Sequence, residues 1–383
     1  MTFYKVKFNF CFLIGFLFQF ILLPAQHVQF DEWKNLTTSG KLSSQIKIQH
    51  SNNNLDLVQF NEKYFLAFRT APTHFASKKA VMYVVSSTDL ENWNYETEIK
   101  LESDLREPRF AVYHDTLNLY FFRGGTKMFR FEPKEVLVCR KSLNDNWSSP
   151  QSIHLDGFVP WRLRARSDTL YLSAYYGKNL YRNNHNSNLR LFSSVDALNW
   201  KPISETPQVD ILSAEEGEFI FDTAGNLFAT VRLEGTGALV CRADKNNLSN
   251  WEKKRTKTKY DSALLFDYNN DIYLVSRRNL DGEIDKTKNR KSEKQGRIRN
   301  LIRYSITRKV TSLFKLNKDD LSLSVVAAFP STGDNAYPAI AKMGDSEFVL
   351  MNYSSDITGR KKNWISGQLG KTYIYWTKLK FIP

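Results

Sequence analysis

One seven-residue pattern occurs six times along the chain. Each copy begins with a polar turn residue and continues as a short apolar strand. The copies are residues 63–69, 118–124, 169–175, 226–232, 271–277 and 347–353. Tryptophans repeat at nearly the same period, with Trp93, Trp147, Trp200 and Trp251 spaced by 54, 53 and 51 residues. Short strands that recur about every 50 residues are typical of a β-propeller with one blade per repeat. We therefore predict an all-β chain that forms a six-bladed β-propeller.

The last position of the repeated pattern holds side chains that can bind or react with a ligand. It holds Arg69, Gly124, Tyr175, Arg232, Arg277 and Tyr353. The inner strands of a propeller line a central funnel. The three arginines and two tyrosines are therefore expected to face one cleft.

The N-terminus is typical of a signal peptide. Lys5 and Lys7 precede a nearly unbroken apolar run from Phe8 to Leu23. The run is shorter than the ~20 residues that a membrane-spanning helix needs, which disfavours the alternative of an uncleaved anchor. We expect cleavage before about His27, so residues 1–26 form the signal peptide and residues 27–383 one propeller domain. The mature chain is then secreted or periplasmic, monomeric, and without a membrane partner.

The formal net charge is +14, and much of it lies between Lys286 and Lys309, where ten Lys or Arg accompany one acid, Glu293. This segment interrupts the fifth repeat. We predict that Leu280 to Arg299 is a mobile excursion, either a solvated loop or a contact for an anionic glycan or polymer. A nucleic-acid partner is not expected, because no aromatic residue lies between Lys286 and Arg303 and no nucleic-acid motif accompanies the charge.

Two cysteines remain after cleavage, Cys139 and Cys241. Both follow the sequence Leu-Val, and they belong to the second and fourth repeats. Those blades would not be neighbours, so two buried free thiols are expected and not a disulfide. No cluster of histidines or carboxylates suggests a metal, and no cofactor is implied.

Two turns resemble the Asp-box turns of sialidases. Residues 87–93 and 194–200 both read Ser-x-Asp-x-x-x-Trp, a turn that furanosidase propellers also contain. The role of this turn is structural. The aspartate is expected to hydrogen-bond within its own turn while the tryptophan packs into the blade.

Three positions resemble the retaining sialidases in the order of their blades. Glu216 and Arg232 stand in the fourth repeat, Arg277 ends the second strand of the fifth, and Tyr337 opens the sixth. The resemblance implies that Tyr337 is the nucleophile and Glu216 its base, at hydrogen-bond distance from the hydroxyl. It also implies that Arg69, Arg232 and Arg277 clamp an anion.

The sequence departs from the sialidase pattern in two places. Asp56 stands where those enzymes have an arginine, and the loop expected to supply an acid contains His74 and no carboxylate. The acid is then His74, Asp56 or Glu107. Other segments are similar to a less-characterised group of secreted sialidase-like propellers, and they add Arg106, Asp334 and Tyr353 as substrate contacts; these segments are residues 68–74, 104–109, 333–338, 353–356 and 371–375.

The function expected is a secreted sialidase-like glycoside hydrolase that acts on a terminal, acidic sugar of a glycan. Two alternatives stay open. Asp56, Glu107 and Glu216 also resemble the three carboxylates of five-bladed furanosidases, since the Arg-Glu-Pro that begins at Arg106 is similar to their Arg-Asp-Pro. A propeller with the same cleft could instead bind a glycan without turnover.

Overall fold

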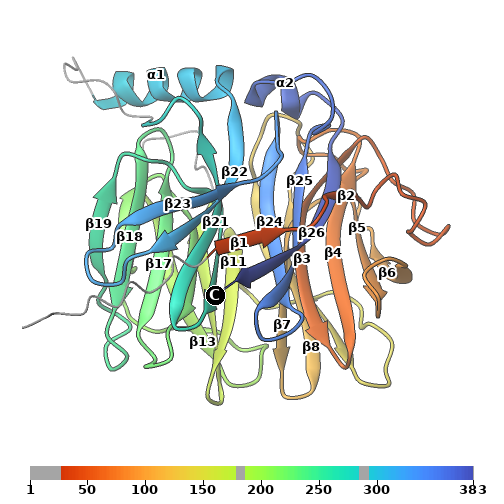
Figure 1. The fold of residues 1–383 in the computed structure, drawn as a ribbon. Coiled ribbons are helices and arrows are strands. Elements are labelled where there is room, and N and C mark those ends of the chain that lie inside the picture. Colours follow the sequence, from red (N-terminus) through yellow and green to blue (C-terminus); the bar gives the residue numbers. More distant parts are fainter. Residues whose placement is uncertain (1–26, 178–185, 284–292, 383) are drawn as a thin grey trace, which may run out of the picture.

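The structure is a computed structural model that describes residues 27–177, 186–283 and 293–382. In this part of the chain, six antiparallel sheets form a ring, a six-bladed β-propeller (Figure 1). The predicted fold class is confirmed. The predicted signal peptide lies outside the described residues.

The first strand of each blade is the one nearest the central axis, because consecutive first strands contact one another around the ring. These strands are β3 (Ser51–Phe60), β7 (Asp104–Tyr113), β11 (Phe158–Arg166), β16 (Ala214–Phe221), β20 (Asp261–Tyr268) and β24 (Asn335–Lys342). The second strands contain the repeated seven-residue pattern, as predicted. They are β4 (Lys63–Ala71), β8 (Thr116–Gly124), β12 (Thr169–Tyr176), β17 (Leu227–Leu233), β21 (Asp271–Asn279) and β25 (Glu347–Ser354).

The outer half of each blade completes the antiparallel meander. The third strands are β5 (Val81–Ser87), β9 (Pro133–Ser142), β13 (Asn186–Ser194), β18 (Gly237–Ala243), β22 (Lys309–Leu316) and β26 (Tyr373–Ile382). The fourth strands of blades one to five are β6 (Asn94–Ile99), β10 (Gln151–Ser152), β14 (Lys201–Pro202), β19 (Glu252–Thr256) and β23 (Leu323–Ala328). In blade three, β15 (Val209–Leu212) also pairs with β13.

The sixth blade is completed from the other end of the chain. β1 (His27–Phe30) pairs antiparallel with β26, and β2 (Lys34–Asn35) continues along the same strand. Residues 45–49, which lie further along the chain, form no strand. Closure by the N-terminal strand joins the two ends of the domain through main-chain hydrogen bonds.

The core is divided into six clusters, each between two neighbouring blades. This is how sheets bury their alternating apolar faces against one another. Cys139 lies in the cluster between blades one and two, and Cys241 in that between blades three and four. Both are buried free thiols, as predicted, and burial raises the pKa of each to about 12.

The two tryptophan turns have the predicted structural role. In the first turn, Asp89 accepts backbone hydrogen bonds from Glu91 and Asn92, while the Trp93 ring is buried and its Nε1 donates to Leu90. The turn of residues 194–200 repeats the aspartate geometry. These bonds fix the loop that leads into the outer strand.

The basic segment differs from the prediction. Its described part contains α1 (Glu293–Ile306), a helix of 14 residues, where we expected a mobile excursion as far as Arg299. Residues 284–292 lie outside the described residues. α1 lies beside α2 (Trp364–Gln368) at one end of the propeller (Figure 1), where the Tyr304 and Trp364 rings meet at 5.6 Å. No helix in the described part of the chain is long and apolar enough to cross a membrane.

Candidate active site

A cavity of about 420 Å³ opens at the end of the ring where α1 and α2 lie. Its volume is within the range of small-molecule sites. Four of the five arginines and tyrosines that end the repeated pattern line it, as predicted; they are Tyr175, Arg232, Arg277 and Tyr353. Arg69 does not. Gly124, at the same position of the second repeat, also lines the cavity.

A β-bulge in the first strand of every blade shapes the floor of this cavity. The pairing register shifts at the same place in all six first strands. In five of them a residue other than glycine adopts a positive φ there; they are Asn54 (45°), Glu107 (54°), Glu216 (48°), Ser262 (49°) and Tyr337 (48°). Bulges re-aim side chains, and residues held in this strained region gather at functional sites.

The bulge residues contact one another around the axis. The Tyr337 hydroxyl donates to Glu107 Oε1 at 2.9 Å, and Asn54 Nδ2 donates to the same oxygen at 3.1 Å. Glu216 Oε2 accepts the backbone N–H of Ser262 at 2.7 Å. Blade three contributes Trp161 at its bulge, whose ring lies 5.6 Å from that of Tyr337. The strained positions therefore bring a phenol and two carboxylates into one cavity.

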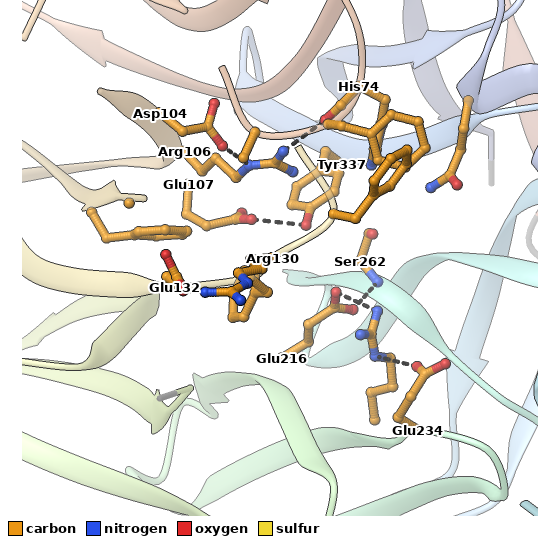
Figure 2. Close-up of a pocket in the computed structure, with 18 of the residues that line it drawn as sticks. His74, Asp104, Arg106, Glu107, Arg130, Glu132, Glu216, Glu234, Ser262 and Tyr337 are labelled. Atoms are coloured by element: carbon orange, nitrogen blue, oxygen red, sulfur yellow. Dashed lines mark hydrogen bonds and ion pairs between the residues drawn. The ribbon is translucent and has the colours of Figure 1, made fainter. Parts of the chain in front are cut away.

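The partner of Tyr337 differs from the prediction. We expected Glu216 at its hydroxyl, and the structure has Glu107 there. Glu216 is turned toward Arg232, whose Nη1 donates to it at 2.5 Å. Figure 2 shows Glu107, Tyr337 and His74 on one side of the cavity and Glu216 with Glu234 on the other. Blades two and four each lie two places from blade six around the ring, so ring order allows either partner. Arg232 holds Glu216, and Glu107 meets the tyrosine instead.

Burial sets the protonation of the Tyr337–Glu107 pair. Burial raises the pKa of Glu107 to about 7, with Arg109 opposing and Glu216 adding to the rise. Burial, together with Glu107 and Glu216, raises the pKa of Tyr337 well above its usual value. The phenol therefore keeps its proton at rest, and Glu107 is a base whose pKa is matched to neutral pH.

His74 lies in the cavity wall and is oriented by a buried carboxylate. Its Nδ1 is 2.6 Å from Asp334 Oδ2, and Asp334 also accepts the Tyr353 hydroxyl at 3.0 Å. Burial acts to raise the pKa of Asp334, but His74 and Arg277 outweigh it and the pKa lies below its usual range. We predicted Asp334 as a direct substrate contact. It does not line the cavity, and its side chain contacts His74 and Tyr353, with Arg277 at 4.0 Å.

The predicted arginine clamp is wrong. Arg69 is fully buried, and its guanidinium donates to Asp104 at 2.7 Å and to the Phe75 carbonyl at 3.0 Å. Arg106 takes its place in the cavity wall. It is held by the other Asp104 oxygen at 2.5 Å and by the His74 carbonyl at 2.7 Å.

The other two clamp arginines are paired with acids. Arg232 contacts Glu216 and Glu215, each at 2.5 Å, and Glu234 at 3.1 Å. Arg277 donates to the Asn335 carbonyl at 2.9 Å and to the Tyr304 hydroxyl at 3.1 Å. A guanidinium that already binds protein oxygens attracts a ligand anion less than a free one. The three arginines therefore do not converge on one ligand anion.

Asp56 is a structural residue. It is buried, its Oδ2 accepts the Phe110 backbone N–H at 2.8 Å, and its Oδ1 lies 3.3 Å from Arg162. Arg162 in turn binds Glu218 at 2.7 Å. This network joins blades one, three and four below the cavity, so Asp56 is not positioned as the acid that we considered.

Sequence reasoning missed several residues of the site. Lys259 is buried between Glu234 at 2.7 Å and Asp261 at 3.3 Å, and Tyr304 of α1 donates to Asp261. None belongs to the repeated pattern. Lys259 and Glu234 lie in connections, Tyr304 in α1, and Asp261 at the start of the first strand of its blade. In the described part of the chain, no group of three or more His, Cys, Asp or Glu side chains is arranged to hold a metal ion.

The comparisons with solved structures agree on the fold. A protein of unknown function from Dyadobacter fermentans is similar with a TM-score of 0.65 and 13% identity, over 93% of this chain and 99% of that one. A Trypanosoma rangeli sialidase has a TM-score of 0.63 and 13% identity, over 92% of this chain and 60% of that one. The endosialidase of phage phi92 has a TM-score of 0.60 and 10% identity, over 88% and 68%. No family model and no curated protein matches the chain.

These structures are sialidase-like propellers at low sequence identity. This chain spans nearly the whole Dyadobacter protein and about three fifths of the sialidase chain. Likeness at this level of identity establishes the propeller architecture. The chemistry has to be argued from the site itself.

Proposed function

We propose that the protein is an exported glycoside hydrolase that removes a terminal sugar, with Tyr337 as nucleophile and Glu107 as its base. The observation that carries the proposal is the hydrogen bond from the Tyr337 hydroxyl to Glu107, formed between two strained bulge residues in one cavity. A phenol needs an adjacent base to attack at neutral pH. Holding both groups on bulges costs folding energy, which a purely structural contact would not require.

The proposed reaction has two steps. In the first, the Tyr337 oxygen attacks the anomeric carbon while Glu107 takes the phenol proton and protonated His74 gives a proton to the leaving oxygen. In the second, His74 takes a proton from water, the water oxygen attacks the same carbon, and the Tyr337 oxygen recovers its proton from Glu107. Asp334 orients the imidazole, as a carboxylate does in a catalytic triad.

The substrate of the proposed hydrolase need not be an acidic sugar. That expectation depended on three convergent arginines, and those in the cavity are paired with carboxylates. The lining contains five acids and five Lys or Arg side chains, so it presents no large excess of positive charge; the acids are Asp104, Glu107, Glu132, Glu216 and Glu234, and the bases Arg106, Arg130, Arg232, Lys259 and Arg277. Glycosides of both acidic and neutral sugars therefore have to be tested as substrates.

The test is a screen of aryl glycosides with acidic and neutral sugars, followed by trapping with the fluorinated analogue of whichever substrate is cleaved. We expect the label on the peptide that contains Tyr337. Tyr337→Phe should abolish turnover while leaving sugar binding within about threefold, because the ring and its packing remain. Tyr176→Phe is the matched control, since it removes a hydroxyl from a ring that packs on Phe158 and does not line the cavity, and it should keep most of the activity.

A second candidate is favoured by one observation. Glu107 and Glu216 both line the cavity, and the charge of Glu216 adds to the raised pKa of Glu107, so the two carboxylates act on one another. Such a pair suffices for acid and base chemistry without a tyrosine nucleophile, as in furanosidases. Turnover that survives Tyr337→Phe but not Glu107→Gln or Glu216→Gln would identify this mechanism. Sugar binding without hydrolysis of any glycoside would identify a glycan-binding protein instead.

A further inference from the structure

In α1 the polar side chains face the propeller and apolar side chains face outward, which is the reverse of an ordinary surface helix. Polar residues hold it to the propeller: Asn300 donates to the Gly235 carbonyl at 2.9 Å, and buried Tyr304 binds Asp261 and Arg277. Three isoleucines, spaced four residues apart, lie on the outer side. Ile298, Ile302 and Ile306 are 49%, 60% and 61% exposed. Residues at this spacing form one stripe along a helix, and a helix on a propeller normally turns such a stripe inward.

Other exposed apolar side chains surround the same cavity mouth. Phe129 is 82% exposed and lies in the cavity-lining loop between β8 and β9. Leu369 is 69% exposed and directly follows α2, whose Trp364 also lines the cavity. Figure 1 shows α1 and α2 together at this end of the ring. Apolar side chains that gather on one face mark an interaction surface.

Basic residues predominate in the helical segments that carry these side chains. Residues 295–308 contain four arginines and no acid, and residues 360–371 contain four Lys or Arg and no acid. Of these, Arg299, Arg308, Arg360 and Lys361 are exposed. Basic side chains beside an exposed apolar stripe are the features of a helix that lies in a lipid interface.

We propose that this end of the propeller docks on an anionic membrane surface, with Ile298, Ile302, Ile306, Phe129 and Leu369 among the acyl chains and the basic residues at the headgroups. We call these five apolar residues and the basic residues beside them the docking face. The sequence alone led us to expect no membrane partner for the mature chain. Because the docking face surrounds the cavity mouth, docking turns the cavity toward the headgroups, where sugars carried by membrane components lie.

Other occupants fit the docking face less well. A second copy of the chain would bring two basic faces together, which is repulsive. A soluble polyanion would satisfy the basic residues but leave the isoleucine stripe in water. Residues 284–292 of this chain contain a single apolar residue, Ile284, so their sequence offers little apolar surface to match the stripe. An anionic bilayer satisfies both the charge and the apolar side chains.

The test is co-sedimentation of the mature protein with vesicles of phosphatidylcholine, with and without phosphatidylglycerol. We expect binding to the anionic vesicles and little to the neutral ones. Ile302→Ser with Ile306→Ser changes no charge and should weaken binding at least about tenfold, since each isoleucine leaves the acyl region. Arg299→Gln and Arg308→Gln should each weaken it about fivefold. Thermal melting confirms that these exposed substitutions leave the fold intact.

Matched controls separate docking from general attraction of a basic protein to anionic lipid. Val195→Ser removes an exposed apolar side chain from a turn between β13 and β14, and Arg255→Gln removes an exposed charge from β19; neither should change binding. Binding that is insensitive to the isoleucine changes overturns the proposal, as does an absence of binding to either vesicle. Self-association that the isoleucine changes abolish, without vesicle binding, identifies a second copy as the occupant. No substrate is used, so failure here is independent of the proposed hydrolase activity.

Discussion

At the scale of single residues, the site depends on burying groups that prefer water. Glu107 is buried and accepts hydrogen bonds from Tyr337 and Asn54, with Arg109 at 3.4 Å from its other oxygen. These contacts do not compensate for burial, because its pKa stays near 7. A carboxylate with this pKa can act as a base near neutral pH. Its burial lowers the free energy of unfolding of the protein.

The first prediction concerns the stability of Glu107→Gln as a function of pH. The folded-state pKa of about 7 is above the ordinary value of 4.5, so the wild-type stability contributed by this group is fully present below pH 4.5 and is lost as the pH rises through 7. Glutamine does not titrate. We therefore expect the variant to gain about 2–3 kcal/mol relative to wild type between about pH 4 and about pH 8.

Denaturant titrations of both proteins across this pH range provide the measurement. Val195→Ser, which replaces an exposed uncharged side chain in the turn between β13 and β14, is the control and should follow the wild-type curve. A free-energy difference between Glu107→Gln and wild type that is constant with pH would contradict the raised pKa. If the hydrolase proposal holds, Glu107→Gln should also lower kcat by about 10²–10⁴, the range for loss of a general base.

At the scale of elements, the six bulges decide which side chains reach the cavity. Glu216 is followed by Gly217, which has no room for a side chain. A Cβ at Gly217 would lie 2.4 Å from Leu189 Cδ2 and 2.5 Å from its Cδ1. Leu189 is fully buried between blades three and four and has little freedom to move. The bulge in β16 therefore depends on this close approach.

The second prediction is that Gly217→Ala destabilises the protein by about 1–3 kcal/mol, the usual cost of overpacking a buried contact. It should also disturb catalysis, because relief of the clash displaces the neighbouring Glu216. Gly344→Ala is the matched control, since a Cβ there meets nothing within 4 Å. Chemical denaturation of both variants measures the effect. Equal free energies of unfolding for Gly217→Ala and Gly344→Ala would show that β16 can accommodate the added Cβ, and would contradict the prediction.

The third prediction concerns the attachment of α1. The Tyr304 hydroxyl donates to Asp261 and accepts from Arg277 Nε, and all three side chains are buried. Tyr304→Phe leaves two buried charged groups without this partner, so we expect a loss of about 1–3 kcal/mol. Amide hydrogen exchange should rise over residues 295–306, while β17 and β18 stay protected.

Tyr268→Phe is the control for this change. Its ring stacks on Phe381 at 4.1 Å, and its hydroxyl makes no hydrogen bond within the described part of the chain. It should therefore melt like the wild type. Unchanged exchange in α1 after Tyr304→Phe would mean that Asn300 and the remaining contacts suffice to hold the helix.

At the scale of the whole molecule, stability depends on closing the ring. β1 pairs with β26 along its whole length, from His27 opposite Ile382 to Phe30 opposite Leu379. Phe30 and Trp33 also pack on Phe329, with ring centroids 5.2 and 5.4 Å away. Without these residues, β26 becomes an open edge strand with apolar neighbours, which favours aggregation.

The fourth prediction is that deleting residues 27–35 costs at least about 3 kcal/mol, because the apolar contacts of Val28, Phe30 and Trp33 are lost together with the strand pairing. Val28→Ala is the graded control. It keeps the main-chain hydrogen bonds and should cost only about 1 kcal/mol. Thermal unfolding and light scattering report the two effects. A deletion variant that melts cooperatively at the wild-type temperature would contradict the role of β1.

The sequence by itself determined the architecture. The repeated pattern and the tryptophan spacing are local signals, because each blade is a meander of neighbouring strands. For the same reason, the arginines and tyrosines that end the repeats could be assigned to the cavity, and this was correct for four of the five, with Arg69 the exception. The free thiols followed from the separation of their blades.

Only the tertiary structure decided which side chains meet. Tyr337 and Glu107 are 230 residues apart and hydrogen-bond because the ring closes, and no spacing in the sequence encodes that contact. Arg69 does not line the cavity, because its guanidinium binds Asp104 of the next blade. α1 could not be recognised from an apolar stripe facing the core, since its polar residues face inward. The local sequence pattern specifies each blade, whereas the contacts that form this site join residues of different blades.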